Sequence, residues 1–513
     1  LIEVEQARLP EPKVLAMLDR FITDDRVFGV LAPHKMVEFF DPAALASLQR
    51  QVAEITGGLV VVMGSGASLV ARGDVRVYAD LARWEIQQRL RCKELGNWGA
   101  QNEEEDILRR YKRAFFIEWR VFDRHKLAQL PTIDFLLDTN TRGKPTLMTG
   151  QALLAGLHQA AHQPFRVVPF FDPGVWGGQW MKQVCDLDPA QPNYAWCFDC
   201  VPEENSLYLR IGEVRVEIPS QNLVLCQPSA LLGERVHARF GAEFPIRFDF
   251  LDTVWGQPLS LQVHPLTEYI QQEFGMHYTQ DESYYLLDAK PDSCVYLGTR
   301  NGIDPQAMLA DLAAAQRGEK PFDDERFINR FPARKHDHFL IPAGTVHCSG
   351  EGAMVLEISA TPYIFTFKLW DWGRLGLDGL PRPVHLDHGQ QVIDWQRDTQ
   401  WVHDNLVNRI EPLAEGEGWR EERTGMHERE FIETRRHWFT APVTHHTHGG
   451  VNVLNLVEGA QAVVESPSGA FPPFIVNYAE TFIIPAAVGE YRISPFGKGI
   501  GQQLATIKAW VRG

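Results

Sequence analysis

The chain has 513 residues, of which 44% are hydrophobic and 23% are charged, and its formal net charge is −16. This composition is typical of globular domains with a sizeable core, and the acidic balance argues against a general binder of nucleic acid or of anionic membranes. A few local cations can still hold a phosphorylated small molecule. No apolar run approaches the roughly 18 residues of a membrane span, and residues 1–13 lack the basic-then-apolar pattern of a signal peptide. We therefore expect a cytoplasmic protein with no membrane or nucleic-acid partner.

The cysteine count is low and odd, seven in all, which is typical of reduced thiols in a cytoplasm. Cys197 and Cys200 form one CxxC pair. A zinc ribbon needs a second such pair, and the sequence contains none. Both residues are therefore predicted to be ordinary half-buried thiols.

Residues 1–145 alternate predicted helices with predicted strands, which indicates a small α/β domain. In the long helical pattern, Asn102 and Glu105 form a plausible capping pair. The segment 138–146, DTNTRGKPT, is interpreted as a linker to the next domain. The predicted helices are 41–55 and 102–130, and the predicted strands are 58–66, 74–80 and 132–138.

The strand at 58–66 ends in Gly-Ser-Gly, which resembles the start of a phosphate-binding loop. A working P-loop has lysine followed by Ser or Thr, whereas Ala67 and Ser68 stand at these positions. We interpret residues 1–145 as a degenerate P-loop-like domain whose backbone N–H groups could hold an anion. A tight strand-to-helix turn is the alternative, and ATP hydrolysis is not expected.

From about residue 165 the chain reads as short strands separated by Gly/Pro turns, the density expected of a β-sandwich or barrel. The predicted domains are 146–400, with a helical insert at 303–331, and 401–513. FIIPAAVGEYRIS in the last domain repeats FLIPAGTVHCSG without its histidine, which suggests two related β-domains. The strands predicted before residue 371 are 166–171, 206–219, 222–226, 245–251, 258–265, 282–289, 294–298, 338–344, 353–359 and 363–370.

Four residues carry side chains suited to a metal. Gln262 and His264 are two apart on a predicted strand and so point to one face. Glu282 opens another strand, and His347 follows the Ile-Pro-Ala-Gly turn. Imidazole and carboxylate ligands suit zinc, and also iron or manganese. The alternative is that these are satisfied polar residues on an open barrel face.

Several motifs, in order, resemble the class I mannose-6-phosphate isomerases, a zinc-dependent cupin family. They span about residues 165–513 and are most specific from 244 to 388. The resemblance implies a mainly β bicupin, that is a double β-barrel or jelly roll with a helical insertion, preceded here by the smaller α/β P-loop-like domain. The matching segments are FFDPGVWGGQWM, EFPIRFDFLDTVWGQPLSLQVHP, ESYYLLDA, IPAGTVHCSGEGAMVLEIS and TFKLWDWGRLGLDGLPRPVH.

The resemblance also implies a site and an activity. One zinc ion per chain would lie among Gln262, His264, Glu282 and His347, with Gln262 the loosest ligand. The enzyme would interconvert mannose 6-phosphate and fructose 6-phosphate by proton transfer between C1 and C2 through a cis-enediol. The substrate would be a phosphorylated hexose, and a homo-oligomer is left open.

The sequence departs from the family at two positions. Gln280 stands where many members have lysine, and Lys368 stands where many have arginine, so sugar choice and rate are in question more than metal binding. Lys368 and Arg374 are the candidate catalytic cations. Together with Gln262, these two and Arg382 are the candidate substrate contacts; solvated loop arginines are the alternative for Arg374 and Arg382.

Two other functions remain open at this point. One is a non-catalytic sugar-phosphate-binding or regulatory bicupin, favoured slightly by Gln280 and Lys368. The other is an iron-dependent oxygenase, which the missing HxH in the first ligand strand opposes.

Two further groups of histidines are interpreted as surface residues. His336 and His338 are expected in an exposed turn, and the His445, His446 and His448 cluster is expected in an exposed loop, with a second metal as its alternative.

Overall fold

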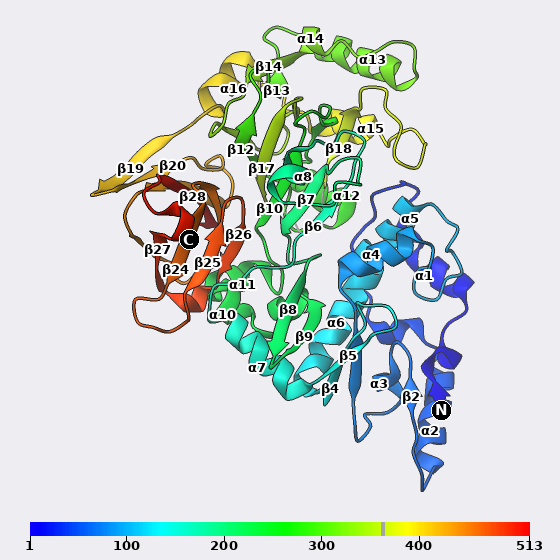
Figure 1. Ribbon diagram of the computed structural model, residues 1–513. Coiled ribbons are helices and arrows are strands. Elements are labelled where there is room, and N and C mark those ends of the chain that lie inside the picture. Colours follow the sequence, from blue (N-terminus) through cyan, green and yellow to red (C-terminus); the bar gives the residue numbers. More distant parts are fainter. Residues whose placement is uncertain (361–364, 513) are drawn as a thin grey trace. The chain divides into compact units, whose positions relative to one another are not determined.

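The computed structural model describes residues 1–360 and 365–512 (Figure 1). These residues fall into two compact units. The first contains Leu1–Gly156, Leu209–Ile218 and Gln272–Met276, and the second contains Leu157–Tyr208, Pro219–Gln271 and His277–Gly513. No helix among the described residues combines the length and the apolar character needed to cross a membrane.

The first unit has a three-stranded sheet formed by β3 (Val77–Asp80), β4 (Phe135–Asp138) and β5 (Thr146–Thr149). Strand β3 pairs with β4 in parallel, and β4 pairs with β5 antiparallel. Residues 139–145 therefore connect two neighbouring strands of one sheet. The prediction that this segment is an interdomain linker was wrong, because a polar Gly/Pro-containing run is equally typical of a turn between paired strands.

The helices of this unit follow the predicted pattern with shifted boundaries. Helix α2 (Pro42–Glu54) begins as expected, with the Asp41 carboxylate accepting from the N–H groups of Ala43 and Ala44. The long pattern from Asn102 instead becomes α5 (Ile107–Arg113), a π-helical turn at Ala114–Glu118 and α6 (Trp119–Gln129). The other helices of this unit include α1 (Glu11–Ile22) and α4 (Arg83–Arg91).

The predicted cap of the long helix lies outside it. Asn102 does contact Glu105, with 2.7 Å between the amide nitrogen and a carboxylate oxygen. The residue that caps α5 is Asp106, which accepts from the N–H of Leu108. The helix therefore starts four residues later than predicted, at another residue type that is preferred as an N-cap.

The Gly-Ser-Gly segment is hydrogen-bonded to a carboxylate from another part of the chain. Strand β2 is only Val62–Met63, paired with β1 (Ile2–Glu3), and helix α3 is only Ala67–Val70. The carboxylate of Glu5 accepts from the N–H of Ser65 at 3.1 Å. A phosphate at this loop would have to displace that carboxylate, so the geometry gives the P-loop interpretation no support.

The second unit contains two pairs of sheets. The strands of the first pair, called here the first sandwich, are β6 (Phe170–Asp172), β7 (Trp196–Cys200), β10 (Arg247–Asp252), β12 (Glu282–Ala289), β15 (His338–Ile341) and β17 (Ala353–Ser359) in one sheet, and β11 (Leu261–Val263), β13 (Cys294–Thr299), β14 (Ile328–Pro332), β16 (His347–Ser349) and β18 (Phe367–Trp370) in the other. The orders are β15-β12-β17-β10-β7-β6 and β14-β13-β16-β11-β18.

The second sandwich follows in the chain and is drawn mainly in orange and red (Figure 1). Its strands are β19 (Glu411–Gly416), β20 (Trp419–Arg423), β21 (Ile432–Phe439), β23 (Asn452–Glu458), β26 (Thr481–Ile484) and β28 (Leu504–Val511) in one sheet, and β22 (Val443–His446), β24 (Gln461–Glu465), β25 (Phe474–Asn477) and β27 (Glu490–Pro495) in the other. The orders are β19-β20-β21-β28-β23-β26 and β22-β27-β24-β25.

The two sandwiches have the same strand order except for β18, which has no counterpart in the second sandwich. Strands β10 to β17 correspond one by one to β21 to β28, and the sheet edge β7-β6 corresponds to β20-β19. The repeat of the Ile-Pro-Ala turn seen in the sequence is thus part of a repeat of the whole β-arrangement.

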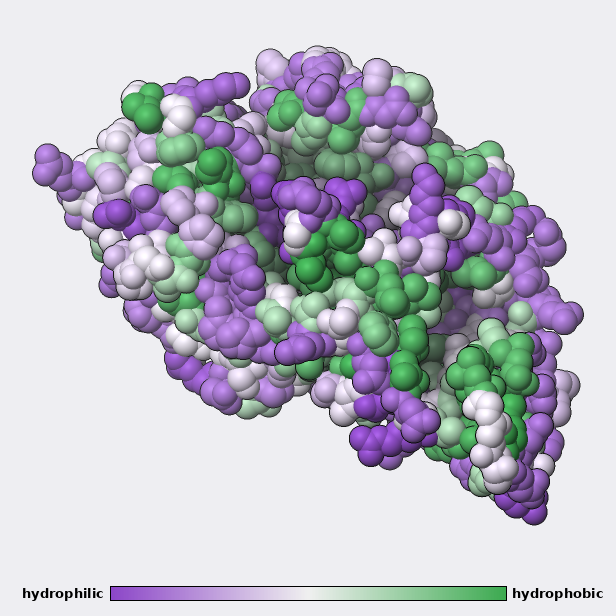
Figure 2. Space-filling model, turned by 60° about the horizontal axis from the view of Figure 1, so that its bottom comes forward, coloured by the Kyte–Doolittle hydropathy of each residue, from purple (hydrophilic) through white to green (hydrophobic). Residues whose placement is uncertain are grey.

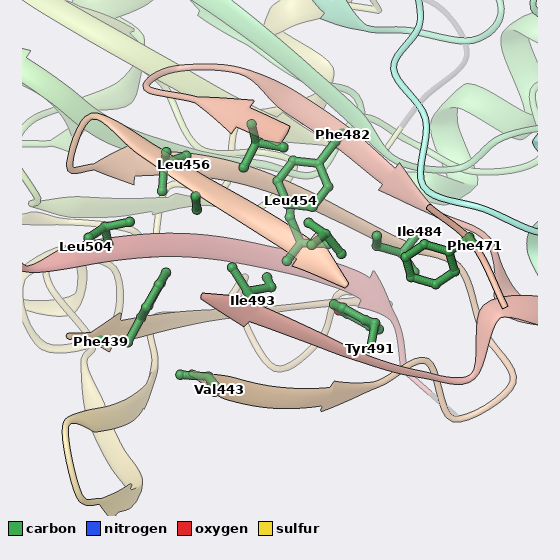
Figure 3. Close-up of a cluster of buried hydrophobic side chains, with 13 residues drawn as sticks. Phe439, Val443, Leu454, Leu456, Phe471, Phe482, Ile484, Tyr491, Ile493 and Leu504 are labelled. Atoms are coloured by element: carbon green, nitrogen blue, oxygen red, sulfur yellow. The ribbon is translucent and has the colours of Figure 1, made fainter. Parts of the chain in front are cut away.

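Most of the second sandwich is packed with apolar side chains from both sheets. Figure 3 shows Leu454, Phe482 and Ile493 pointing toward one another between the strands. The surface in Figure 2 carries separate apolar patches among hydrophilic residues, which is ordinary for a folded protein.

Several strand predictions changed in the structure. Residues 222–226 are helical, within α9 (Gln221–Cys226), because an apolar run of this length fits a buried helix as well as a strand. The helical insert contains α13 (Pro305–Gln316) and α14 (Asp324–Phe327). The strand predicted at 363–370 is β18 from Phe367, and residues 363 and 364 lie outside the described residues. The remaining helices are α7 (Gly150–Ala160), α8 (Trp180–Val184), α10 (Pro228–Leu232), α11 (Glu234–Phe240), α12 (Thr267–Phe274), α15 (Leu386–Val392) and α16 (Thr399–Asn405).

Candidate metal centre

Three of the four predicted ligands meet between the two sheets of the first sandwich. His264 follows β11, His347 opens β16, and Glu282 opens β12 in the opposite sheet. One ligand atom from each lies within 4.8 Å of the other two, and they are the only such group of His, Cys, Asp and Glu side chains in the part of the chain that the structure describes. All three side chains are buried.

Both imidazoles are held by their other ring nitrogen. Nδ1 of His264 lies 3.0 Å from the carbonyl oxygen of Phe365, and Nδ1 of His347 lies 2.9 Å from that of Thr345. A carbonyl oxygen can only accept, so each Nδ1 carries the proton and each neutral ring presents the lone pair of Nε2. This is the tautomer that binds a metal through Nε2.

The two Nε2 atoms face the carboxylate of Glu282. Nε2 of His264 is 3.1 Å from Oε2, and Nε2 of His347 is 2.9 Å from Oε1. Burial raises the pKa of Glu282, whereas a proton on the Nε2 atoms of the two imidazoles lowers it below the ordinary value. A cation bound between these atoms would take the place of that proton and keep the carboxylate ionised. Burial lowers the pKa of His347, which keeps its ring neutral.

These atoms fit a cation. Two imidazole lone pairs and a carboxylate converge on one buried point, and acceptors that face one another in a buried space repel unless a positive charge lies between them. Nε2 of His264 and Oε1 of Glu282 have no well-aligned hydrogen-bond partner. Nitrogen and oxygen ligands of this kind are those of zinc, iron or manganese sites.

Gln262 and Lys368 face the same space. On the sheet, Gln262 is directly opposite His347 on one side and Lys368 on the other, and such cross-strand partners share a face. The amide Nε2 of Gln262 is 3.4 Å from Nε2 of His347. With the amide group turned by 180°, its oxygen would face the same point as a ligand.

Gln280 supports the centre rather than completing it. Its amide donates to Oε2 of Glu282 at 3.0 Å, and its oxygen accepts from the N–H of Phe365 at 2.7 Å. Phe365 is also the residue whose carbonyl holds His264. Gln280 thereby links the carboxylate ligand to the segment that orients an imidazole ligand.

A buried charged layer lies behind these ligands. Arg247 and Asp249 form an ion pair at 3.1 Å, and Asp249 is directly opposite Glu357. Burial, with the negative charges of Glu282 and Asp249, raises the pKa of Glu357 well above its usual range, so this carboxyl is protonated. The interior of the first sandwich is therefore polar beneath the metal centre.

Arg374 and Arg382 lie together on Asp371. Arg374 contacts one oxygen of Asp371 at 2.6 Å, and Arg382 contacts the other at 2.8 Å. Arg374 also donates to the carbonyl oxygen of Pro258 at 2.7 Å, and Ser260 donates to Asp371. Both arginines are thus partly buried and engaged rather than solvated loop residues.

Strand geometry separates this arginine pair from the ligands. Ser260, which contacts Asp371, precedes Gln262 by two residues, about 7 Å along a strand. Asp371 and its two arginines therefore lie about that distance along the sheet from the level of Gln262 and Lys368. The sequence prediction named both arginines and missed Asp371, the acceptor that joins them. The run DWGR did contain that signal, because Asp371 and Arg374 are three residues apart.

The other histidine and cysteine predictions were partly wrong. His338 is fully buried on β15, and burial lowers its pKa to about 3. His445 is buried on β22, whereas His446 and His448 are exposed as expected. Cys197 and Cys200 are fully buried on β7 rather than half-buried. From sequence alone, a polar residue on a short strand is predicted to be exposed, because the sheet that covers the strand is not known.

Residues 1–162 match the family described as Domain of unknown function (DUF8485). The chain is also similar to the mannose-6-phosphate isomerase ManA of Bacillus subtilis, with 29% identity over 154 residues that make up 30% of this chain and 45% of the relative. The mannose-6-phosphate isomerase of Streptococcus mutans is 26% identical over 150 residues, 29% of this chain and 44% of the relative. The matched part thus spans less than half the length of these two relatives.

Two solved structures share the fold. The mannose 6-phosphate isomerase from Bacillus subtilis superposes with a TM-score of 0.53 and 17% identity over 67% of this chain and 99% of its own. A mutant of phosphomannose isomerase from Salmonella typhimurium superposes with a TM-score of 0.51 and 15% identity, over 68% of this chain and 99% of its own. The chain is therefore homologous to mannose-6-phosphate isomerases over a limited region and has their β-rich fold over about two thirds of its length.

Proposed function

We propose that the chain is a zinc-dependent aldose–ketose isomerase that interconverts mannose 6-phosphate and fructose 6-phosphate. The observation that carries the proposal is the buried group of His264, Glu282 and His347, with each imidazole held in the tautomer that exposes Nε2. The similarity to mannose-6-phosphate isomerases supports the same reaction.

Zinc would be held by these three residues, with the amide oxygen of Gln262 as a looser fourth ligand. When bound, it would supply a Lewis acid that polarises the sugar carbonyl and stabilises the developing enediolate charge. The chain itself keeps the ligands preorganised, because both imidazoles and the carboxylate are fixed by buried hydrogen bonds.

Lys368 is the proposed cation of the reaction. It is half-buried, it faces the same side of the sheet as Gln262, and its ammonium would hold the substrate's phosphate or the negative charge of the enediolate. Arg374 and Arg382 would assist only if the substrate competed with Asp371 for them. The proton would move between C1 and C2 of the substrate through a cis-enediol.

The proposal includes the class I membership, the bicupin fold and the domain division. The matching strand orders of the two sandwiches support a bicupin with one ligand-bearing half. Under this view the first sandwich, within residues 146–400, carries the reaction and residues 401–513 form the second cupin-like domain. The added α/β domain contains residues 1–145 and also β5 (Thr146–Thr149), which pairs with β4.

Metal content and activity test the proposal together. The purified chain should hold about one zinc per chain, and zinc-loaded protein should convert mannose 6-phosphate to fructose 6-phosphate. His347→Ala and Glu282→Gln should lose both the metal and the turnover while keeping the far-UV circular dichroism spectrum. Lys498→Met, which alters an exposed lysine far along the chain, should change neither. Full zinc occupancy without isomerase activity would refute the reaction, and full activity of metal-free protein would refute the role of the metal.

A further inference from the structure

A cavity lies in the second sandwich, and the proposed reaction does not use it. Its volume is about 390 Å³, which is in the range of pockets that hold small molecules. Its walls come from both sheets of the sandwich, and they include two indoles, from Trp419 and Trp510.

Two cations face each other in this cavity. Arg435 on β21 and Lys508 on β28 are direct cross-strand partners, so their side chains share a face. On the next strand Lys508 is opposite Leu454, which belongs to the apolar core shown in Figure 3. Both cations therefore point inward, and like charges directly opposite each other on a sheet are destabilising.

Two buried histidines beside them have nitrogens without partners. Nε2 of His445 and Nδ1 of His437 have no hydrogen-bond partner, although these side chains are only 4% and 3% exposed. Nδ1 of His445 is 3.4 Å from the ammonium of Lys508. Buried polar atoms are normally paired, so unpaired nitrogens lining a cavity point to a ligand that completes them.

Among the described residues that line the cavity, one carboxylate is present, and it is already engaged. Glu421 contacts Nε2 of His437 at 3.1 Å and Arg435 at 3.0 Å. Arg435 also pairs with Glu433 at 3.3 Å, whereas no ion pair joins Lys508 to a carboxylate among the described residues. The positive charge left for a ligand is therefore that of Lys508, before any imidazole is protonated.

The repeat between the sandwiches shows that this charge is reversed relative to the metal centre. The Ile-Pro-Ala turns align Ile341 with Ile484, whose cross-strand partners are Glu282 and Asn452. Following the same sheet registers across the next two strands, Lys508 occupies the position of Glu357, and Arg435 occupies the position of Asp249. By the same register Glu433 occupies the position of Arg247, so the ion pair Arg247–Asp249 appears with its charges exchanged as Glu433–Arg435. The net change is the replacement of the carboxyl of Glu357 by the ammonium of Lys508.

The metal ligands are not repeated. By the same alignment, His446 and His448 take the positions of Gln262 and His264, and Glu490 takes that of His347. Among the described residues these side chains do not come together as a ligand group. The cavity thus offers cations and imidazoles without a metal-binding carboxylate at its centre.

We propose that the cavity of the second sandwich binds a small organic phosphate, with the phosphate group on Lys508, Arg435 and His445. Cationic and imidazole N–H groups are the usual partners of phosphate oxygens. The indoles of Trp419 and Trp510 would cover the apolar face of the organic part, as aromatic rings do in small-molecule pockets.

Calorimetric titration of the full, zinc-loaded chain with inorganic phosphate and with mannose 6-phosphate tests this proposal. Lys508→Met should raise the dissociation constant for inorganic phosphate at least about tenfold, the loss expected for one charge-assisted contact. His445→Phe keeps a ring stacked on Tyr491 and removes only the nitrogens, so it should weaken binding several-fold. Lys498→Met removes the same charge from an exposed position of the same sandwich and should have no effect.

A further variant distinguishes phosphate binding in the second sandwich from binding at the candidate metal centre. Lys368→Ala alters the proposed isomerase site. It should bind inorganic phosphate in the second sandwich as tightly as the wild type does, whether or not the isomerase proposal holds. The inference is overturned if wild-type protein binds neither compound, or if Lys508→Met binds both with unchanged affinity. It is also overturned if a second divalent metal is found that His446→Ala removes.

Discussion

Lys508 in the second sandwich gives the most quantitative prediction of stability. Burial, the largest effect, together with the nearby charge of Arg435 lowers the pKa of its ammonium from 10.5 to about 8, while Glu421 acts in the opposite direction. One pKa unit corresponds to about 1.4 kcal/mol, so the buried charge should lower the free energy of unfolding by roughly 3 kcal/mol at pH 7. Lys508→Met removes the charge and keeps much of the side-chain volume, and it should recover most of this free energy.

The destabilisation by the Lys508 charge should decrease as the pH rises. Below pH 8 both the folded and the unfolded chain carry the proton, and the full cost is present. Between pH 8 and 10.5 the unfolded chain still binds a proton that the folded chain has lost, so the wild type gains stability as the pH rises. At pH 9.5 the advantage of Lys508→Met should be about half of its value at pH 7 or less.

Urea unfolding at the two pH values, in phosphate-free buffer, measures this difference. The transition of the second sandwich can be identified with Val464→Ala, which truncates a fully buried core residue and should shift the same transition downward. Lys498→Met serves as the exposed control and should be silent. An advantage of Lys508→Met that is the same at both pH values, or a loss of stability at pH 7, would refute a buried, destabilising charge.

Three further predictions concern the first sandwich. Lys368→Ala should lower kcat/KM at least about a hundredfold, as expected for a lost electrostatic stabiliser, while Lys368→Arg should keep or raise it; two silent variants would exclude the lysine from the reaction. Gln280→Leu should weaken zinc binding by about 10–100-fold in competition with a chelator, because it frees the Glu282 carboxylate; an unchanged affinity would contradict a positioning role. Asp371→Asn should destabilise the fold by about 3 kcal/mol in urea unfolding, since two partly buried arginines lose their shared charge; a change below about 0.5 kcal/mol, as at an ordinary surface position, would show that the arginine pair does not stabilise the fold.

The sequence by itself predicted a strand-rich fold and the His and Glu side chains of the candidate metal centre. Period-two alternation and Gly/Pro turns predicted a strand-rich region, and the strand around Gln262 and His264 was readable because alternate residues share a face. The repeated Ile-Pro-Ala turn predicted the second β-domain. Local patterns of this kind survive folding because they are set by backbone geometry and by burial of one face.

Only the tertiary structure decided which of these residues meet. The pairing of Lys368 with Gln262, and of Arg435 with Lys508, depends on the register between strands that are distant in the chain, and a shift of one residue would reverse every face. His445 was wrongly expected in an exposed loop for the same reason. Whether a polar side chain on a short strand faces water or a cavity depends on the second sheet that covers it, and no local pattern in the sequence specifies that sheet.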